Sequence, residues 1–373
     1  MVNAGYAGGG ILTVDLDAIA ANWRLLRDRL HGATCAAVLK ADAYGLGLAP
    51  VATRLAAEGC MHFFVAQLEE AVQLRTILRD AGSTAPIYVL NGLAQGMTAD
   101  HLAHAAWPAL NSLGEVDGWT AFARTRGETL PAILNVDTGM ARLGLPVDEA
   151  EALADEPRRL DGVRVDYIMS HLACAYDRAN PLNAAQRAAF IRWRERLLPA
   201  KASFANSAGI FLGPENHFDL ARPGAALFGL APLANESNPM AQVVILKGKI
   251  LQIRGVDRGM TVGYGATHRI TRRSRLATVA VGYGDGYLRS LGNAGSGFIG
   301  GIRVPVVGRV SMDLVTFDVT EVPEHEARPG ATVDLISRDH DVDALAVEAG
   351  TIGYEILTAL GRRYHRRYLG AGA

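Results

Sequence analysis

Residues 36–47 read AAVLKADAYGLG, a short apolar run that ends abruptly in Lys40. The run has the length of a buried strand, and lysine is among the side chains that are most costly to remove from water. A lysine at such a point can form a structural ion pair, hold an oxyanion or attack a carbonyl, since burial lowers the pKa of its amine. The surrounding sequence has to decide among these three roles.

Seven further apolar runs of strand length follow the first, at intervals typical of βα units. The predicted strands are residues 36–39, 63–66, 87–90, 108–110, 132–136, 166–169, 202–204 and 225–227. Amphipathic stretches such as LEEAVQLR at 68–75 lie between them and have the period of a helix. Eight buried strands alternating with helices predict an α/β fold, a (β/α)8 TIM-type barrel, with a doubly wound open sheet as the alternative.

Polar residues stand at the carboxyl ends of nearly all these predicted strands. They are Lys40, Asn91, Asn111, Asp137, Ser170 with His171, and Asn206 with Ser207, while Arg222 comes just before the last strand. Barrels of this type keep their catalytic groups at the carboxyl ends of the strands. We therefore expect a functional site there, although a single histidine at a strand end is more often structural.

The loops around the last two predicted strands are suited to a phosphate group. They read ANSAG at 205–209 and RPGA at 222–225, which supplies a hydroxyl and the amides of small residues. Barrels commonly build a phosphate site from the loops after strands seven and eight. Ordinary turns remain the alternative interpretation of these two stretches.

The character of the sequence changes near residue 238, after a stretch that is rich in Pro, Asn and Ser. Beyond it, β-type runs at 243–246, 276–281, 302–307 and 314–319 are separated by glycine-containing turns, and a helix is expected near 354–360. We predict a barrel over residues 10–238 and a smaller β-rich C-terminal domain over 239–373, which the N-terminal residues 1–9 could join.

The composition restricts the class of protein. The chain has 373 residues and a net charge of −1, which gives no overall field for nucleic acid or an anionic membrane. No run reaches the roughly 18–20 apolar residues of a membrane span, and the N-terminus lacks a signal-peptide pattern. Three scattered cysteines argue against a disulfide framework or a zinc site, so we expect a cytoplasmic protein without a metal.

The basic run RRYHRR at 362–367 is expected to be a solvated helix end or an interface.

Nine motifs resemble those of alanine racemases, pyridoxal-phosphate enzymes with a barrel and a C-terminal β-domain. They follow the family's order and span nearly the whole chain: AVLKADAYG (37–45), VDTGMARLG (136–144), SHLA (170–173), ANSAG (205–209), RPG (222–224), YGAT (264–267), GYGDG (282–286), GRVSMD (308–313) and TIGYE (351–355). The resemblance implies a homodimer that uses pyridoxal 5′-phosphate to interconvert L- and D-alanine, the latter a peptidoglycan precursor.

The resemblance also implies a role for each matching residue. Lys40 would carry the cofactor as a Schiff base, and Tyr264 would be the second catalytic acid–base group. The groups that would bind the cofactor phosphate are Tyr44, Ser207, Tyr354 and the amides of Gly224 and Ala225.

Four other matching residues would contact the cofactor ring or the substrate. Arg222 would donate a hydrogen bond to the pyridine nitrogen, with His171 near the ring. Arg142 would lie beside the phenolic oxygen of the cofactor, and Met312 near the substrate carboxylate. In the family Tyr264 and Met312 come from the second subunit, so the resemblance implies composite active sites.

These residue types suit racemisation, because a proton must leave one face of Cα and return to the other. Lys40 and Tyr264 would serve the two faces. A tyrosine has an ordinary pKa of about 10 and needs nearby positive charge to act near neutral pH, which Arg222 and His171 could supply. The main alternative is a racemase of broader amino-acid specificity on the same scaffold. A barrel decarboxylase fits the YGAT motif poorly, and single-barrel proteins that bind pyridoxal phosphate lack the second domain.

Three positions differ from the family pattern. Asn135 stands where a carbamylated lysine is common, so we expect a bound chloride or a water to orient Arg142. Ser203 replaces a histidine, so the hydrogen bonds behind Arg222 must be rebuilt or shortened. Leu46 replaces another histidine, and we expect it to affect packing rather than chemistry.

Overall fold

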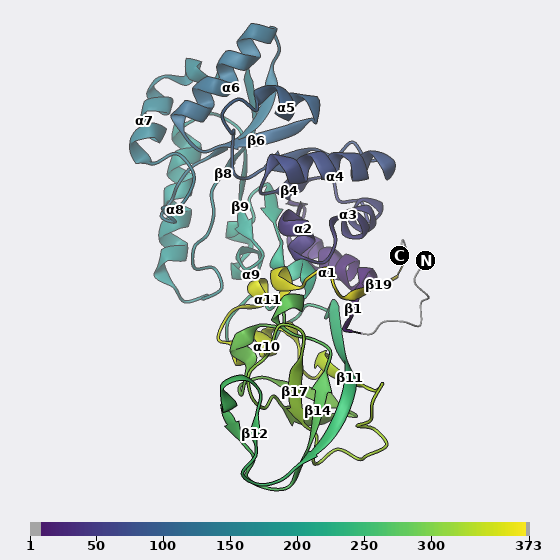
Figure 1. The fold of residues 1–373 in the computed structure, drawn as a ribbon. Coiled ribbons are helices and arrows are strands. Elements are labelled where there is room, and N and C mark those ends of the chain that lie inside the picture. The colour runs from purple at the N-terminus through teal and green to yellow at the C-terminus, as the bar shows by residue number, and fades with distance from the viewer. Residues whose placement is uncertain (1–8, 371–373) are drawn as a thin grey trace.

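The computed structural model describes residues 9–370. It has two parts, a barrel with its surrounding helices and a β-rich domain below it, which meet near α1 (Leu16–Arg29), α11 (Gly353–Ala359) and β19 (His365–Leu369) (Figure 1). One cluster of buried side chains runs through both parts, from Leu26 and Val65 to Phe317. The predicted fold class, a barrel followed by a smaller β-rich domain, is confirmed.

The barrel sheet is parallel, and its order is β2-β10-β9-β8-β7-β6-β5-β4-β3. Its strands are β2 (Thr34–Cys35), β3 (Ala37–Val38), β4 (Phe63–Val65), β5 (Ile87–Val89), β6 (Ala106–Leu110), β7 (Leu130–Asn135), β8 (Val163–Met169), β9 (Lys201–Asn206) and β10 (Leu220–Arg222). Because β2 and β3 are consecutive pieces of one segment that pairs with β10 on one side and β4 on the other, the sheet is nearly closed.

Helices follow the barrel strands and cover the outside of the sheet (Figure 1). After α1 they are α3 (Leu48–Ala57), α4 (Leu68–Asp80), α5 (Thr98–Ala103), α6 (Leu113–Arg126), α7 (Val147–Asp155), α8 (Pro181–Arg196) and α9 (Gly209–Leu212), with short 3-10 helices η1 (Pro157–Leu160) and η2 (Pro214–Asn216). No helix in the described part of the chain combines the length and the apolar character needed to cross a bilayer.

The predicted eighth strand, residues 225–227, is wrong. The eighth strand is β10, which ends at Arg222, and Ala225–Phe228 forms the 3-10 helix η3. Pro223 has no amide hydrogen to continue a ladder, and Gly229 ends η3 with a φ of 88°. In a short, fully buried apolar run, the spacing of the apolar residues does not distinguish a strand from a helix. With the strand placed correctly, Arg222 lies at the carboxyl end of β10 and not before a strand.

The C-terminal domain is built on an eight-stranded sheet with the central order β16-β15-β18-β11-β1-β19. Its strands are β1 (Ile11–Asp15), β11 (Val244–Val256), β14 (Ser274–Val279), β15 (Ser296–Ile299), β16 (Ile302–Pro305), β17 (Val315–Asp318), β18 (Thr332–Ile336) and β19. The hairpin β12 (Thr261–Val262) with β13 (His268–Arg269), the 3-10 helices η4 (Tyr264–Ala266), η5 (Tyr283–Asp285) and η6 (Arg289–Leu291), and the helix α10 (Val342–Ala349) complete it with α11.

The two ends of the described chain meet in this sheet, since β1 pairs with both β11 and β19. The expected contribution of residues 1–9 lies almost entirely outside the described residues, and the domain boundary at 238/239 stays a prediction. The basic run at 362–367 leads into β19 instead of ending a helix.

A left-handed turn, α2 (Lys40–Tyr44), follows the first barrel strand. Ala41, Asp42, Ala43 and Tyr44 all have φ between 53° and 56°, and Gly45 continues with 79°. Left-handed helical backbone costs roughly 1–2 kcal/mol for each residue with a Cβ. Contacts with the rest of the protein must therefore hold this turn, which sets the direction of the Lys40 side chain.

Candidate active site

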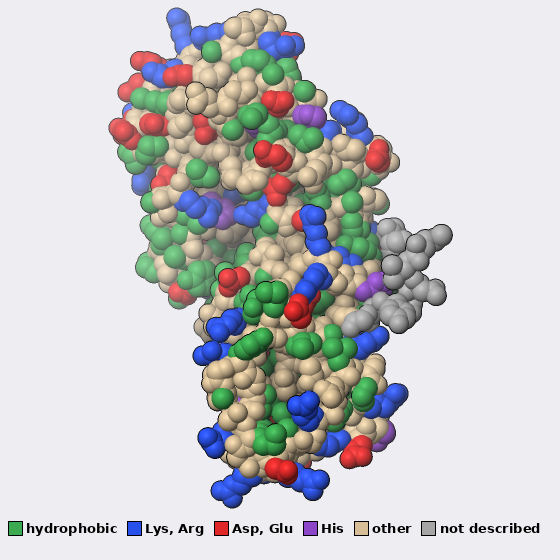
Figure 2. Space-filling view, viewed as in Figure 1, with side chains coloured by type: hydrophobic (Ala, Val, Ile, Leu, Met, Phe, Trp, Pro, Cys, Tyr) green, Lys and Arg blue, Asp and Glu red, His purple; other side chains and the backbone are tan. Residues whose placement is uncertain are grey.

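A cavity of about 460 Å³ lies at the carboxyl ends of the barrel strands. Figure 2 shows Lys, Arg and His side chains around a hollow in this part of the barrel. Nine of the predicted site residues line the cavity: Lys40, Tyr44, Arg142, His171, Ser207, Arg222, Gly224, Ala225 and Tyr354. Asp137 is the only acidic residue in its described lining, so the cavity is suited to anionic groups.

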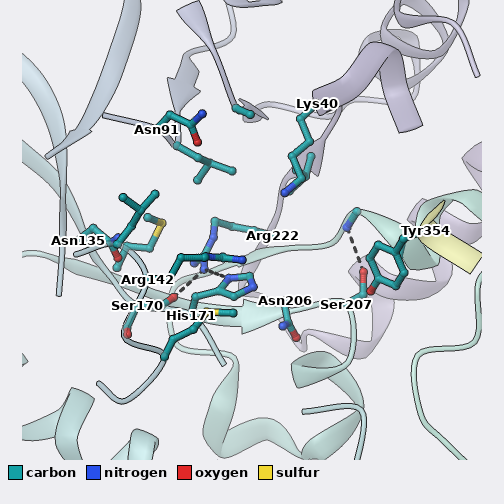
Figure 3. A pocket seen from close by; sticks show the side chains of 18 of the residues that line it. Lys40, Asn91, Asn135, Arg142, Ser170, His171, Asn206, Ser207, Arg222 and Tyr354 are labelled. Carbon is teal, nitrogen blue, oxygen red and sulfur yellow. Dashed lines mark hydrogen bonds between the residues drawn. The ribbon is translucent and has the colours of Figure 1, made fainter. Parts of the chain in front are cut away.

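Lys40 points into this cavity from the start of α2 (Figure 3). Its pKa is lowered from the ordinary 10.5, first by burial and then by the positive charge of Arg142, while Glu70 acts in the opposite direction. The fraction of neutral amine at a given pH is therefore larger than for a lysine in water. This is the state that attacks a carbonyl or accepts a proton.

Arg222 is the most deeply buried cation of the site. Its guanidinium donates to the carbonyl oxygen of Ser170 at 2.7 Å and to Oγ of Ser203, which in turn donates to the carbonyl of Leu220 at 2.8 Å. Burial lowers the pKa of Arg222 to about 9, so it stays charged at neutral pH. The hydrogen bonds behind Arg222 were expected to be rebuilt or shortened at Ser203. In the structure they run from Arg222 through the Ser203 hydroxyl to the backbone carbonyl of Leu220.

His171 lies beside Arg222, and its Nδ1 is 3.4 Å from the guanidinium Nη2 (Figure 3). Because Arg222 can only donate, Nδ1 is the accepting nitrogen of the ring. Burial and the charges of Arg222, Arg142 and Lys40 lower the pKa of His171 from 6.5 to about 3. The ring is therefore neutral at neutral pH, and of the two positive charges expected near a catalytic tyrosine only that of Arg222 remains.

The other end of the cavity forms a cradle of a size and chemistry that fit a phosphate. Oγ of Ser207 accepts hydrogen bonds from the amides of Gly224 at 3.0 Å and Ala226 at 3.2 Å. A Cβ on Gly224 would lie 2.3 Å from Oη of Tyr44, so only glycine fits there. The rings of Tyr44 and Tyr354 lie 6.1 Å apart and close this end. Hydroxyls and main-chain amides around a narrow space are the usual groups of an anion site.

Arg142 is carried by the loop after β7, which Asp137 orders. One carboxylate oxygen of Asp137 accepts from the amides of Gly139 at 2.9 Å, Met140 at 2.9 Å and Ala141 at 3.2 Å. The Asp137 carboxylate therefore binds the backbone of the loop, and the Arg142 side chain lines the cavity.

Asn135 lies at the end of β7 and donates from Nδ2 to Oδ1 of Asn111 at 2.7 Å. Asn111 in turn donates to the carbonyls of Ala109 at 2.8 Å and Leu90 at 3.3 Å. These bonds fix the orientation of the Asn135 amide at the cavity wall. The chloride or water expected near Arg142 stays a prediction.

Two predicted site residues, Tyr264 and Met312, are not among the residues that line this cavity. Both belong to the C-terminal domain, and the neighbouring hairpin strand β12 lies at its far end from the barrel (Figure 1). Tyr264 is 74% exposed and Met312 is 54% exposed. A separate depression of about 320 Å³ joins Tyr264 to Tyr283, Arg289, Arg309, Val310 and Ser311. Within one chain, the structure does not bring Tyr264 and Lys40 together.

Sequence reasoning missed several residues that support the site. Glu70 accepts hydrogen bonds from the amide of Ala41 and from those of Ala66 and Gln67, so it ties the start of α2 to the start of α4. Its position three residues after Gln67, at a helix start, is a capping signal that could have been noticed. Met140 also lines the cavity, but no sequence signal set it apart.

Both parts of the chain match known family models. Residues 14–232 match the alanine racemase N-terminal domain, and residues 243–368 match the alanine racemase C-terminal domain. The chain is 52% identical to an alanine racemase of Rhodospirillum rubrum over 361 residues, which is 96% of each chain. It is 46% identical to a catabolic alanine racemase of Mesorhizobium japonicum, over 98% of this chain and 94% of the relative.

Solved structures agree with these sequence matches. The alanine racemase of Bartonella henselae, with covalently bound pyridoxal phosphate, has a TM-score of 0.93 and 39% identity and covers 97% of this chain and 99% of its own. The biosynthetic alanine racemase of Pseudomonas aeruginosa has a TM-score of 0.88 and 34% identity, with the same coverage. The chain belongs to the alanine racemase family.

Proposed function

We propose that this protein interconverts L- and D-alanine with pyridoxal 5′-phosphate as its cofactor. The observation that carries the proposal is the meeting of three features in one cavity: the amine of Lys40, the buried guanidinium of Arg222 and the cradle at Ser207. Pyridoxal phosphate has an aldehyde, a ring nitrogen and a phosphate, and the three features would bind one of these groups each. No observation favours a racemase of broader specificity.

The residues present fit the cofactor. Lys40 would bond to its aldehyde carbon, Arg222 would donate to its ring nitrogen, and Ser207, Tyr44 and Tyr354 with the amides of Gly224 and Ala225 would hold its phosphate. When bound, the cofactor withdraws electrons from Cα of the amino acid and so weakens the Cα–H bond. Arg222 would keep its proton while it donates to the ring nitrogen, so it would support a weaker electron sink than an acidic partner would.

Two groups of the protein would move the proton at Cα. Lys40 would exchange a proton with one face, where its lowered pKa favours the neutral amine that accepts it. Tyr264 would serve the other face. Arg142 would contact the phenolic oxygen of the cofactor and Met312 the substrate carboxylate, and the positive charge of Arg142 would favour that carboxylate in the cavity.

Tyr264 can reach Lys40 only if a second subunit supplies it, so we infer a homodimer with composite active sites. The exposure of Tyr264, Met312, Tyr283 and Leu314 supports this inference, because together they leave a large apolar area in water. We also propose a cytoplasmic location, with D-alanine, a peptidoglycan precursor, as one of the two enantiomers that the protein interconverts.

The proposed activity is tested by incubating the purified protein with pyridoxal phosphate and a panel of single L-amino acids, and by measuring each D-enantiomer by chiral chromatography. We expect D-alanine to form fastest. Equal rates with a basic amino acid would contradict alanine specificity, and no racemisation of any amino acid would contradict the proposal as a whole.

The composite site is tested by mixing two inactive variants, Lys40→Ala and Tyr264→Phe, after dissociation and reassembly. If the sites are shared, a mixed dimer has one site with both groups intact. At equal amounts about half of the dimers are mixed, so about a quarter of the wild-type activity should return. Each variant mixed with wild-type protein is the control. No gain on mixing would mean that both groups act within one chain.

A further inference from the structure

The strand β19 reaches across the domain junction to the segment that follows Lys40. Arg366 donates from Nη1 to the carbonyl oxygen of Gly45 at 2.8 Å. Tyr368 donates from Oη to the carbonyl oxygen of Leu46 at 3.0 Å. The basic run at 362–367, which the proposed chemistry does not use, therefore has a specific contact next to the active site.

The two carbonyls lie directly after the left-handed turn that begins at Lys40. The turn is short and bonded within itself, with the amide of Ala43 donating to Leu39 at 2.9 Å and that of Gly45 to Ala41 at 2.7 Å. A displacement of Gly45 is therefore passed along the turn toward its first residue. Tyr44, whose ring closes the phosphate cradle, lies in the same turn.

The packing at the end of the turn is close. A Cβ on Gly45 would lie 2.4 Å from the carbonyl oxygen of Leu357 in α11, and a Cβ on Gly47 would lie 2.3 Å from Oη of Tyr368. At its start, the turn is held by Glu70 through the amide of Ala41. The turn is thus fixed from the barrel side at its first residues and from the C-terminal domain at its last.

We propose that Arg366 and Tyr368 are positioning residues, which hold the turn so that Lys40 and Tyr44 meet the cofactor in the right geometry. The proposal rests on the proposed function, because it assigns a purpose to the placement of Lys40. Both side chains donate to backbone carbonyls, so these hydrogen bonds do not depend on which side chain is at position 46. Leu46, which departs from the family pattern, is fully buried and leaves its carbonyl available to Tyr368.

β19 also supplies a matched control. Arg366 and Tyr368 share the half-buried face of the strand, whereas Arg367 between them is on the exposed face. The variants to compare are Arg366→Ala, Arg366→Lys and Tyr368→Phe, with Arg367→Ala as the control. Tyr368→Phe removes a single hydroxyl and Arg366→Lys keeps the charge, so these two decide the outcome if Arg366→Ala does not fold.

Three independent measurements report on the turn in each variant. The first is amide hydrogen exchange of the peptide that contains residues 40–48 in the apoprotein. The second is the affinity of the apoprotein for pyridoxal phosphate, measured by absorbance titration. The third is the pH dependence of the reaction of Lys40 with an amine reagent in the apoprotein, which reports how strongly its surroundings desolvate the amine.

We expect Tyr368→Phe to weaken cofactor binding by about two- to tenfold, the range for a neutral hydrogen bond, and to speed exchange in residues 40–48. Arg366→Ala should weaken it by at least about tenfold, with partial recovery in Arg366→Lys. In both weakened variants the labelling of Lys40 should shift to higher pH, as its amine becomes better solvated. Arg367→Ala should match the wild type in all three measurements.

The proposal is overturned if Tyr368→Phe and Arg366→Lys equal Arg367→Ala in exchange, cofactor affinity and Lys40 labelling. This failure differs from that of the proposed function. If the wild-type protein does not racemise alanine, the function fails, but exchange in the apoprotein still reports whether β19 holds the turn. If the wild type is active and all variants behave alike, only the positioning role fails.

Discussion

Two regions are proposed to supply catalytic groups, the barrel mouth and the C-terminal domain. They differ in how much of each group's surroundings a single chain provides. At the barrel mouth, Lys40 and Arg222 are desolvated, and Arg222 is hydrogen-bonded to its neighbours. In the C-terminal domain, Tyr264 projects from a turn between Gly263 and Gly265 and is mostly in water. The barrel side is preorganised by contacts within the subunit, whereas the tyrosine side lacks the surroundings that a catalytic group needs.

The difference indicates where each kind of substitution should act. On the barrel side, the hydrogen bonds that position the site residues also stabilise the fold. A substitution that removes one should therefore affect cofactor binding, stability and the pH dependence of both. On the tyrosine side, a change should affect catalysis and leave the stability of the chain alone. Four predictions test this division.

The largest effect is expected for Lys40→Ala compared with Tyr264→Phe. Lys40→Ala should abolish racemisation, by about 10⁴-fold or more, and remove the absorbance band of the protein-bound cofactor. Tyr264→Phe should lower racemisation by about 10²- to 10⁴-fold but keep that band. The measurements are chiral product analysis and absorption spectra of both variants. Loss of the band in Tyr264→Phe would show that the tyrosine side also builds the cofactor site.

The second prediction concerns stability. Ser203→Ala would leave one nitrogen of Arg222 and the carbonyl of Leu220 without their buried partner, so the free energy of unfolding should fall by about 1–3 kcal/mol. Tyr264→Phe removes a hydroxyl that is exposed within one subunit and should change the free energy of unfolding by less than about 0.5 kcal/mol. Urea denaturation of the two apoproteins at one protein concentration compares them. Equal losses would remove the proposed distinction between the two regions.

The third prediction concerns pH. The pKa of His171 is about 3 in the folded protein against an ordinary 6.5, so below pH 6.5 the unfolded chain binds a proton that the folded chain does not. This contribution to stability is therefore complete above pH 6.5 and is lost as the pH falls toward 3, by at most about 1.4 kcal/mol per pH unit. His171→Gln should flatten the slope measured by denaturation between pH 6.5 and 4. His325→Gln, at an exposed histidine, should keep it; an unchanged slope in His171→Gln would contradict the prediction.

The smallest effect is expected from changing the anion near Asn135. It tests whether the barrel side needs a bound ion in addition to the groups of its own chain. If a chloride orients Arg142, replacing chloride by a bulky anion should lower kcat/KM a few-fold, on the order of 1 kcal/mol or less. Asn135→Asp would supply its own negative charge and should lose this dependence. A crystal soaked in bromide should show an anomalous peak beside Arg142. Electron density with neither an anion nor a water at that position would contradict the prediction.

Local patterns predict the architecture and the cavity residues at the strand ends, whereas Tyr44, Arg142 and Tyr354 are predicted by the resemblance to the family. Buried runs at regular intervals give the barrel, and polar residues after the runs mark the end where side chains converge. Nine predicted site residues, among them Lys40, Arg222 and Tyr354, line one cavity even though the last belongs to the C-terminal domain. Their roles stay predictions until the variants are made.

What sequence reasoning missed depends on contacts between distant residues. The bond from Arg366 to Gly45 joins residues 321 positions apart, and neither residue has a local signal for it. The run at 225–227 was assigned to a strand because a buried apolar segment has no period that separates a strand from a 3-10 helix. The positive φ angles of Ala41 and Ala43 could not be foreseen, since alanine has no preference for that region.

The left-handed turn has a consequence for the synthesis of the chain. Its four residues with positive φ are held by contacts, and those from β19 belong to a part of the sequence that leaves the ribosome more than 300 residues after Lys40. Domains fold in order of synthesis, so a nascent barrel can close before this support exists. The segment that carries the reactive amine is then the last of the barrel to be fixed. A truncated product of translation, lacking β19, would contain every barrel strand and Glu70, but not the hydrogen bonds from Arg366 and Tyr368 that follow the turn.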